Sequence, residues 1–181
     1  DVYKRQGYRR DRKGVEQIMQ NIVLCGFMGS GKTVVGRELA KIMGCRFVDT
    51  DELIEQEQGV AIKAIFATRG EEYFRDLEHE MCKKVATMKN CVVSTGGGAM
   101  TYKRNVDAIK QGATVVFLDA SFPVICDRIG NNSNRPLFQD RKKAKKLYDE
   151  RKDKYTAAAD YIIDGDMSAR KTALEISEIF K

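Results

Sequence analysis

The sequence predicts an α/β protein with three layers, α/β/α, built around a five-stranded parallel sheet. Two observations predict this class. Short apolar runs alternate with helical patterns along the chain, and a glycine-rich loop stands between the first run and the first helix. Because alternating strands and helices form parallel sheets covered on both faces, ligands are expected at the carboxyl ends of the strands.

The expected elements follow one another in a regular order. Five apolar runs fit buried parallel strands, at residues 21–25, 45–48, 91–94, 114–118 and 160–163. Helices are expected where apolar residues recur at three- and four-residue spacing, at residues 34–43, 53–58, 61–68, 71–88, 102–110, 122–129, 141–158 and 168–180. The polar, Pro-stopped segment 130–136 breaks the pattern, so a lid is predicted at about 129–140, with a plain surface loop as the alternative.

The first 20 residues match no regular element, and residues 1–18 are predicted to be a non-native leader. Residues 1–6 read as the translation of a transposon sequencing adapter, and residues 13–15 can encode a ribosome-binding site ahead of Met19. The native domain is therefore predicted to be 19–181, with a disordered basic tail as the alternative. The leader holds six Lys/Arg and three acids, so without it the formal charge falls from +6 to +3. A charge of +3 suits a small anionic ligand and is a weak argument for nucleic acid.

Composition narrows the class of protein further. No stretch approaches the ~20 apolar residues of a membrane span, and no signal peptide is present, so a cytoplasmic location without membrane contact is predicted. The five cysteines are scattered without CxxC spacing, which favours neither a disulfide framework nor a zinc site. His79 is the only histidine and stands between two glutamates, so histidine-based catalysis is not expected.

Residues 26–33, GFMGSGKT, form a P-loop pattern between an apolar run and a helix. Such a loop places backbone N–H groups and the positive end of a helix dipole around one point, which suits nucleotide phosphates. Lys32 is predicted to reach the β- and γ-phosphates, and the Thr33 hydroxyl to ligate Mg²⁺. The predicted nucleotide-binding residues here are Gly29, Ser30, Gly31, Lys32, Thr33 and Val34.

Three further patterns follow predicted strands or lie on a predicted helix. Asp49 and Asp51 leave the second strand, where they can serve the Mg²⁺ shell and an acceptor hydroxyl, or simply cap the next helix. Arg75 and Glu78 share a helix face, either as a buried carboxylate clamp or as a surface ion pair. The glycines at 96–98 end the third strand and let backbone N–H groups approach a ligand.

Taken together, the motifs resemble those of the shikimate kinases. The matching segments are GFMGSGKT, FVDTD, IFATRGEEYFRDLE, STGGG, RIGNNSNRPL and ERKDKYTAAAD, in the family's order over roughly residues 20 to 165. The resemblance implies a P-loop NTPase fold of the nucleoside monophosphate kinase-like type. It also implies transfer of the ATP γ-phosphoryl group to the 3-hydroxyl of shikimate, in aromatic amino acid biosynthesis, by an enzyme that is usually a monomer.

The resemblance further implies a role for each matching residue. Asp51 would bind the shikimate hydroxyls and help to deprotonate one of them, while Asp49 would support the Mg²⁺ shell. Arg128 would lie near the nucleotide phosphates, and Arg135 would close from the lid onto the transferring phosphate. The remaining residues expected to bind shikimate are Phe66, Phe74, Arg75, Glu78, Gly96, Gly97, Gly98 and Arg151.

Three other functions compete with this interpretation. A gluconate kinase would share the P-loop, but Asp51, Arg75 and the glycines at 96–98 suit a ring that carries hydroxyls and a carboxylate. A catalytically silent regulator would have lost such acceptor residues. A nucleic-acid binder would need a basic and aromatic surface that the sequence lacks. Residues 164–170 lack the proline expected of an adenine-facing loop, so no adenine contact is assigned there.

Overall fold

Five parallel strands form one sheet in a computed structural model that describes residues 8–10, 16–18, 20–130 and 140–181. The strand order is β4-β5-β3-β6-β7, so the strand that feeds the P-loop is central. The strands are β3 (Asn21–Cys25), β4 (Arg46–Asp49), β5 (Cys91–Ser94), β6 (Ala113–Asp119) and β7 (Tyr161–Asp164). The predicted parallel sheet is therefore confirmed.

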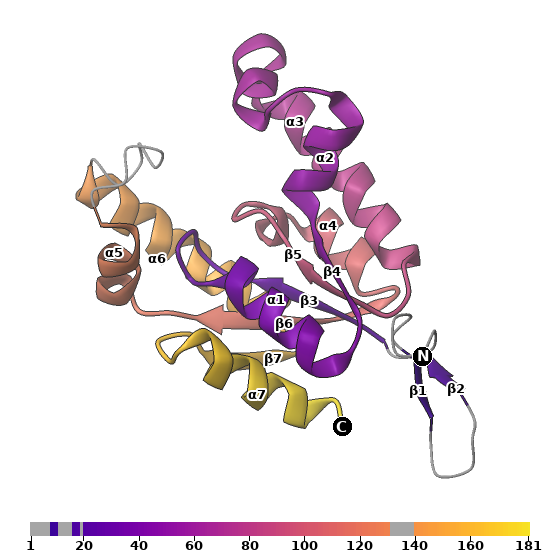
Figure 1. Cartoon of the computed structure of the whole chain (residues 1–181). Helices are drawn as coiled ribbons and strands as arrows, with labels where there is room; N and C mark the ends of the chain where they lie inside the picture. The colour runs from indigo at the N-terminus through magenta and orange to yellow at the C-terminus, as the bar shows by residue number, and fades with distance from the viewer. Residues whose placement is uncertain (1–7, 11–15, 19, 131–139) are drawn as a thin grey trace.

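Helices cover both faces of this sheet (Figure 1). On one face α1 (Lys32–Met43) packs against α7 (Ala169–Ile179). The other elements are α2 (Thr50–Gln58), α3 (Ile62–Thr87), the 3-10 helix η2 (Ala99–Thr101), α4 (Lys103–Ile109), α5 (Phe122–Ile129) and α6 (Arg141–Ala158). Of these, α3, α4, α6 and η2 pack against one another on the opposite face, which completes the three-layer fold.

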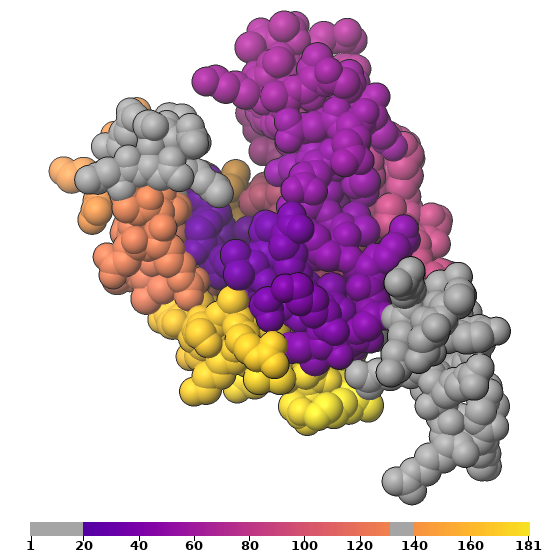
Figure 2. Space-filling view, in the orientation of Figure 1, coloured from indigo at the N-terminus to yellow at the C-terminus, as the bar shows by residue number. Residues whose placement is uncertain are grey.

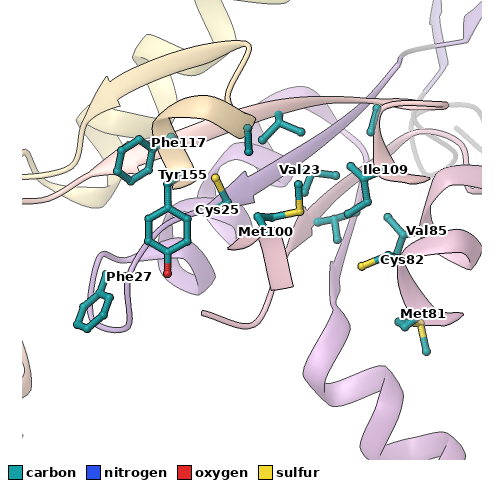
Figure 3. Packing of buried hydrophobic residues seen from close by; sticks show 14 of the residues in the cluster. Val23, Cys25, Phe27, Met81, Cys82, Val85, Met100, Ile109, Phe117 and Tyr155 are labelled. Atoms are coloured by element: carbon teal, nitrogen blue, oxygen red, sulfur yellow. The ribbon is translucent and has the colours of Figure 1, made fainter. Parts of the chain in front are cut away.

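The hydrophobic core is divided by the sheet into two clusters. Ile22 and Leu24 of β3 pack with α1 and α7, whereas Val23 and Cys25 pack on the other side with α3 and α6. Successive side chains of a strand point to opposite faces, so a strand buried on both sides needs a continuous apolar run. Figure 3 shows the second cluster, where Tyr155 of α6 lies beside Phe117 of β6.

Most expected boundaries lie within a few residues of the observed ones, and the differences have local causes. The helix expected at 53–58 begins instead at Thr50, because Asp49 caps it. The two helices expected at 61–68 and 71–88 form α3, which is interrupted where Gly70 takes φ 83° and ψ 171°. The short η2 was not expected. Within the described residues, no helix is long and apolar enough to span a membrane.

The expectation of no regular element in the first 20 residues was wrong for two short strands. β1 (Tyr8–Arg10) and β2 (Glu16–Ile18) pair antiparallel, with Arg9 opposite Gln17. This pairing forms a two-stranded sheet apart from the five-stranded one. The start of the native domain at Met19 stays a prediction.

Candidate active site

A cavity of about 730 Å³ opens at the carboxyl ends of the strands. Figure 2 shows the surface hollowed between the magenta residues of α2 and α3 and the orange residues of α5. The cavity is lined by residues 28–35 of the P-loop and α1, by Asp49, Asp51 and Glu52, by residues 94–97, by Arg128, and by Gly165 and residues 167–169. The segments predicted to bind nucleotide and acceptor thus meet at one edge of the sheet.

The P-loop owes its curl to glycines with positive φ. Gly29 has φ 77° and Gly31 has φ 96°, a region that other residues rarely adopt. Gly31 is the N-cap of α1, so the free N–H groups of the first turn face the cavity. A Cβ on Gly29 would also lie 2.7 Å from the Ile129 side chain. The loop therefore has the backbone conformation that the P-loop pattern predicts, and its binding of nucleotide phosphates stays a prediction.

The Lys32 side chain is buried inside this curl. Its Nζ donates hydrogen bonds to the carbonyls of Gly26, at 2.7 Å, and of Phe27, at 3.0 Å. These two carbonyls hold the ammonium group next to the backbone N–H groups at the start of α1. A phosphate seated in the loop would meet the positive charge at short range, where little water screens it.

Thr33 and Asp49 are the residues predicted to serve Mg²⁺, and both line the cavity. Asp49 is the N-cap of α2, because its Oδ1 accepts hydrogen bonds from the N–H groups of Asp51, at 2.9 Å, and Glu52, at 3.1 Å. The capping interpretation is therefore confirmed, and it leaves Asp49 Oδ2 for other partners. In the described part of the chain, no three His, Cys, Asp or Glu residues form a metal-binding group. The Thr33 hydroxyl and the single Asp49 carboxylate fit Mg²⁺, because this ion keeps several waters and binds through few carboxylates plus substrate phosphates.

Asp51 carries a buried carboxylate oxygen that has no hydrogen-bond partner among the described residues, Oδ1. Burial and the neighbouring Asp49 carboxylate raise the pKa of Asp51 to about 6, against an opposing effect of Lys32. Because an unpaired buried oxygen is costly, it marks a place where a ligand hydroxyl can donate. A carboxylate with a pKa near 6 is also a better proton acceptor at neutral pH than an ordinary aspartate.

Arg75 and Glu78 form a buried ion pair, so the interpretation as a surface pair is wrong. The Arg75 Nη1 to Glu78 Oε1 distance is 2.9 Å, and the Glu78 side chain is 1% exposed. Burial raises the pKa of Glu78 to about 7, with the Arg75 guanidinium acting in the opposite direction. The Arg75 Nε is buried and has no hydrogen bond within the described chain, although Glu71 Oε1 lies 3.5 Å away. Glu78 thus orients a guanidinium that keeps donors for a ligand.

The three glycines at 96–98 lie against the charged side chains of this site. A Cβ on Gly96 would stand 2.7 Å from Asp51 Oδ1, and a Cβ on Gly98 would stand 2.7 Å from Arg75 Nη1. A Cβ on Gly97 would be 3.5 Å from Nη1 of Arg151. A Cβ on Gly96 or Gly98 would displace the charged group beside it, whereas a Cβ on Gly97 would make an ordinary van der Waals contact. Glycine is therefore required for close approach at 96 and 98, and the structure brings together Asp51, Arg75 and Arg151.

An aromatic surface borders the Arg75 guanidinium. The rings of Phe66 and Phe74 are 4.8 Å apart, and Phe66 is 36% exposed. The Arg75 Cζ lies 5.3 Å from the centre of the Phe74 ring and 5.2 Å from that of Tyr102. Tyr102 was missed as a site residue, because the sequence predicts only that it begins a helix at 102–110, and the structure places it at the N-cap of α4. Of the two predicted phenylalanines, Phe74 thus lies beside the predicted arginine, and Phe66 packs against Phe74.

Arg128 is fixed by backbone carbonyls from two segments. Its Nη1 donates to Ser30 O at 3.2 Å, and its Nη2 donates to Gly165 O at 2.7 Å and to Met167 O at 3.2 Å. The guanidinium therefore joins the P-loop to the segment before α7. That segment also lines the cavity, although no adenine contact was assigned to residues 164–170 because they lack the expected proline. Arg135 and the predicted lid, apart from its two ends, lie outside the described residues.

This chain has a parallel sheet with a P-loop, and the Arg75–Glu78 ion pair lies near that loop. These features are typical of P-loop kinases that act on small molecules. Comparison with known proteins identifies the family. A family model described as "Shikimate kinase" matches residues 28–181. The chain belongs to the shikimate kinase family.

Individual relatives agree with this family. A shikimate kinase of Moorella thermoacetica is 44% identical over 165 residues, 89% of this chain and 94% of the relative. One of Sulfurihydrogenibium sp. is 45% identical over 141 residues, 77% of this chain and 85% of the relative. Among solved structures, shikimate kinase from Acinetobacter baumannii in complex with shikimate has a TM-score of 0.83 at 36% identity, covering 89% of this chain and 92% of that one.

Proposed function

We propose that this chain transfers the γ-phosphoryl group of ATP to the 3-hydroxyl of shikimate, a step in aromatic amino acid biosynthesis. The observation that carries the proposal is the placement of the buried Arg75 and Glu78 pair, with Asp51, on the glycines at 96–98 beside the P-loop. Membership of the shikimate kinase family supports the same activity. So does the similarity to an A. baumannii shikimate kinase that binds shikimate.

The acceptor site has the chemistry of a ring acid. Two guanidinium groups, from Arg75 and Arg151, lie against neighbouring glycines and suit a carboxylate. The partly exposed Phe66 ring supplies an apolar wall for the face of a ring. Asp51 on the P-loop side of the glycines suits the hydroxyls, because an ionised carboxylate only accepts hydrogen bonds. A substrate held at both ends is fixed in orientation before it reacts.

The reaction needs one proton acceptor and positive charge around the γ-phosphate. The 3-hydroxyl oxygen forms a bond to phosphorus, the bond from phosphorus to the β-phosphate oxygen breaks, and the hydroxyl proton passes to Asp51. Lys32 and the N–H groups at the start of α1 stabilise the charge that develops on the phosphate oxygens. The products are shikimate 3-phosphate and ADP.

Mg²⁺ is proposed as the metal, held by the Thr33 hydroxyl and supported by Asp49. When bound, it neutralises charge on the β- and γ-phosphates. The Asp49 carboxylate is already oriented by the two N–H groups that it caps. Arg135 of the predicted lid is proposed to add a further positive charge. A monomeric state and a cytoplasmic location stay predictions.

ADP release with Mg-ATP in the presence of shikimate, gluconate or no acceptor tests the proposal. We expect release that depends on shikimate and is near background in the other two reactions. Turnover with gluconate alone would mean that the acceptor site has been misinterpreted. ATP binding without turnover of any acceptor would support a silent regulator instead.

A further inference from the structure

Tyr155 holds the carbonyl of Gly97, a glycine that lines the active-site cavity. It lies on α6, four residues after Arg151, and its hydroxyl donates a hydrogen bond to Gly97 O. The Tyr155 ring is 2% exposed and packs 5.3 Å from the Phe117 ring. Figure 3 shows this ring with its oxygen pointing away from Phe117. The ring is thus fixed by the core, and its hydroxyl is held in one position.

The same peptide unit contains the Gly97 carbonyl and the Gly98 N–H. In a planar trans peptide these two groups point in opposite directions. A hydroxyl that holds the carbonyl on one side therefore turns the Gly98 N–H to the other side. Within the described chain, the N–H of Gly98 has no hydrogen-bond acceptor, and Gly98 itself is buried against the Arg75 guanidinium. A peptide between two glycines flips easily unless something holds it, because neither residue has a Cβ.

Tyr155 also stands beside the second acceptor arginine. Residues four apart on a helix are neighbours, and the Arg151 guanidinium lies close enough to the Tyr155 hydroxyl to oppose the effect of burial on its pKa. Arg151 in turn reaches Gly97, because its Nη1 is 3.5 Å from the position of a Cβ there. The hydroxyl is therefore in contact with both elements that face the acceptor.

We propose that Tyr155 is a positioning residue for the acceptor site, which fixes the peptide between Gly97 and Gly98 and the guanidinium of Arg151. It touches neither ATP nor acceptor in this proposal, which rests on the proposed function. Loss of its hydroxyl would leave the partly buried Gly97 carbonyl without this partner and free the peptide to flip. The effect should fall on the acceptor and spare the nucleotide.

The substitution Tyr155→Phe tests this proposal, with Tyr148→Phe as its matched control. Tyr148 is also on α6, is 8% exposed, and its hydroxyl donates to a carbonyl, Ala120 O, at 2.8 Å. Each variant loses one hydrogen bond to a backbone carbonyl, buried for Tyr148 and partly buried for Tyr155, so their melting temperatures should fall by similar amounts. We expect Tyr155→Phe to lower kcat/KM for shikimate about tenfold, because the freed peptide and guanidinium no longer hold the acceptor in position. The KM of Tyr155→Phe for ATP should stay within about twofold of the parent value. For Tyr148→Phe, both kcat/KM for shikimate and KM for ATP should stay within about twofold of the parent values.

A double-mutant cycle with Arg151→Ala separates the two contacts. If Tyr155 acts partly through Arg151, Tyr155→Phe should cost clearly less than tenfold in the Arg151→Ala background, and an undiminished loss would overturn that part of the proposal. Equal kinetics for Tyr155→Phe and Tyr148→Phe, or an equal rise in both substrates' KM values, would overturn the positioning role. No shikimate-dependent turnover by the unchanged chain would instead overturn the proposed function, and this inference with it.

Discussion

Replacing Asp51 by Asn should stabilise the fold at neutral pH while it removes activity. The Asp51 pKa rises from 3.8 to about 6 in the folded chain, chiefly through burial. A tenfold change in an ionisation equilibrium is about 1.4 kcal/mol, so the folded state pays up to about 3 kcal/mol to ionise this carboxyl at pH 8. Asn has nearly the same shape and carries no charge, so it avoids that cost. The unpaired Oδ1 is thus a site where function opposes stability.

The stability gained by replacing Asp51 with Asn should increase with pH. Below about pH 3.8 the carboxyl is neutral in both the folded and the unfolded chain, so Asn has no advantage there. Between pH 3.8 and about 6 the unfolded chain releases its proton first, and the advantage of Asn grows with pH. Above about pH 6 the advantage is complete.

Urea denaturation of the ligand-free protein at pH 4 and pH 8 measures the effect. We expect Asp51→Asn to raise the free energy of unfolding by about 2–3 kcal/mol at pH 8, and by much less at pH 4. Asp107→Asn is the control, because Asp107 is an exposed carboxylate paired with Lys103 and should change stability by less than about 0.5 kcal/mol. The reasoning fails if Asp51→Asn destabilises the chain at pH 8, or if its effect is the same at both pH values. Shikimate-dependent kcat should fall at least about 100-fold at pH 8.

Three further substitutions test separate parts of the site. Lys32→Ala should lower kcat at least about 100-fold with an unchanged circular dichroism spectrum, and near-normal turnover would refute the role of the P-loop lysine. Arg75→Ala should raise the KM for shikimate strongly with little change in ATP binding, and the opposite pattern would move Arg75 out of the acceptor site. Gly98→Ala places a Cβ 2.7 Å from Arg75 Nη1, so the KM for shikimate should rise about tenfold while that for ATP stays constant. An unchanged shikimate KM in Gly98→Ala would show that the guanidinium moves aside without loss.

The sheet and the P-loop were predictable because their signals are local. Strands buried on both faces must be apolar throughout, and the run at residues 21–25 coincides with β3. The loop at 26–33 carries its glycines at the positions that need positive φ. Such patterns depend on neighbours in the sequence, so one chain suffices to recognise them.

Burial and long-range contacts were not predictable in the same way. An Arg and a Glu three residues apart look alike on a surface and in a core, and only the structure shows Glu78 to be buried. Tyr155 contacts a carbonyl 58 residues earlier in the chain, and no sequence pattern reports that contact. A hydroxyl four residues after a predicted substrate arginine was the one signal that could have pointed to it.

The position of phosphorylation tests the central claim most directly. Shikimate and Mg-ATP are incubated with the protein, and the product is examined by two-dimensional phosphorus and proton NMR. We predict one new phosphorus resonance that correlates with the proton on carbon 3 of shikimate, in an amount equal to the ADP formed. Phosphorus coupled to another ring position, or free inorganic phosphate with unchanged shikimate, would contradict the account.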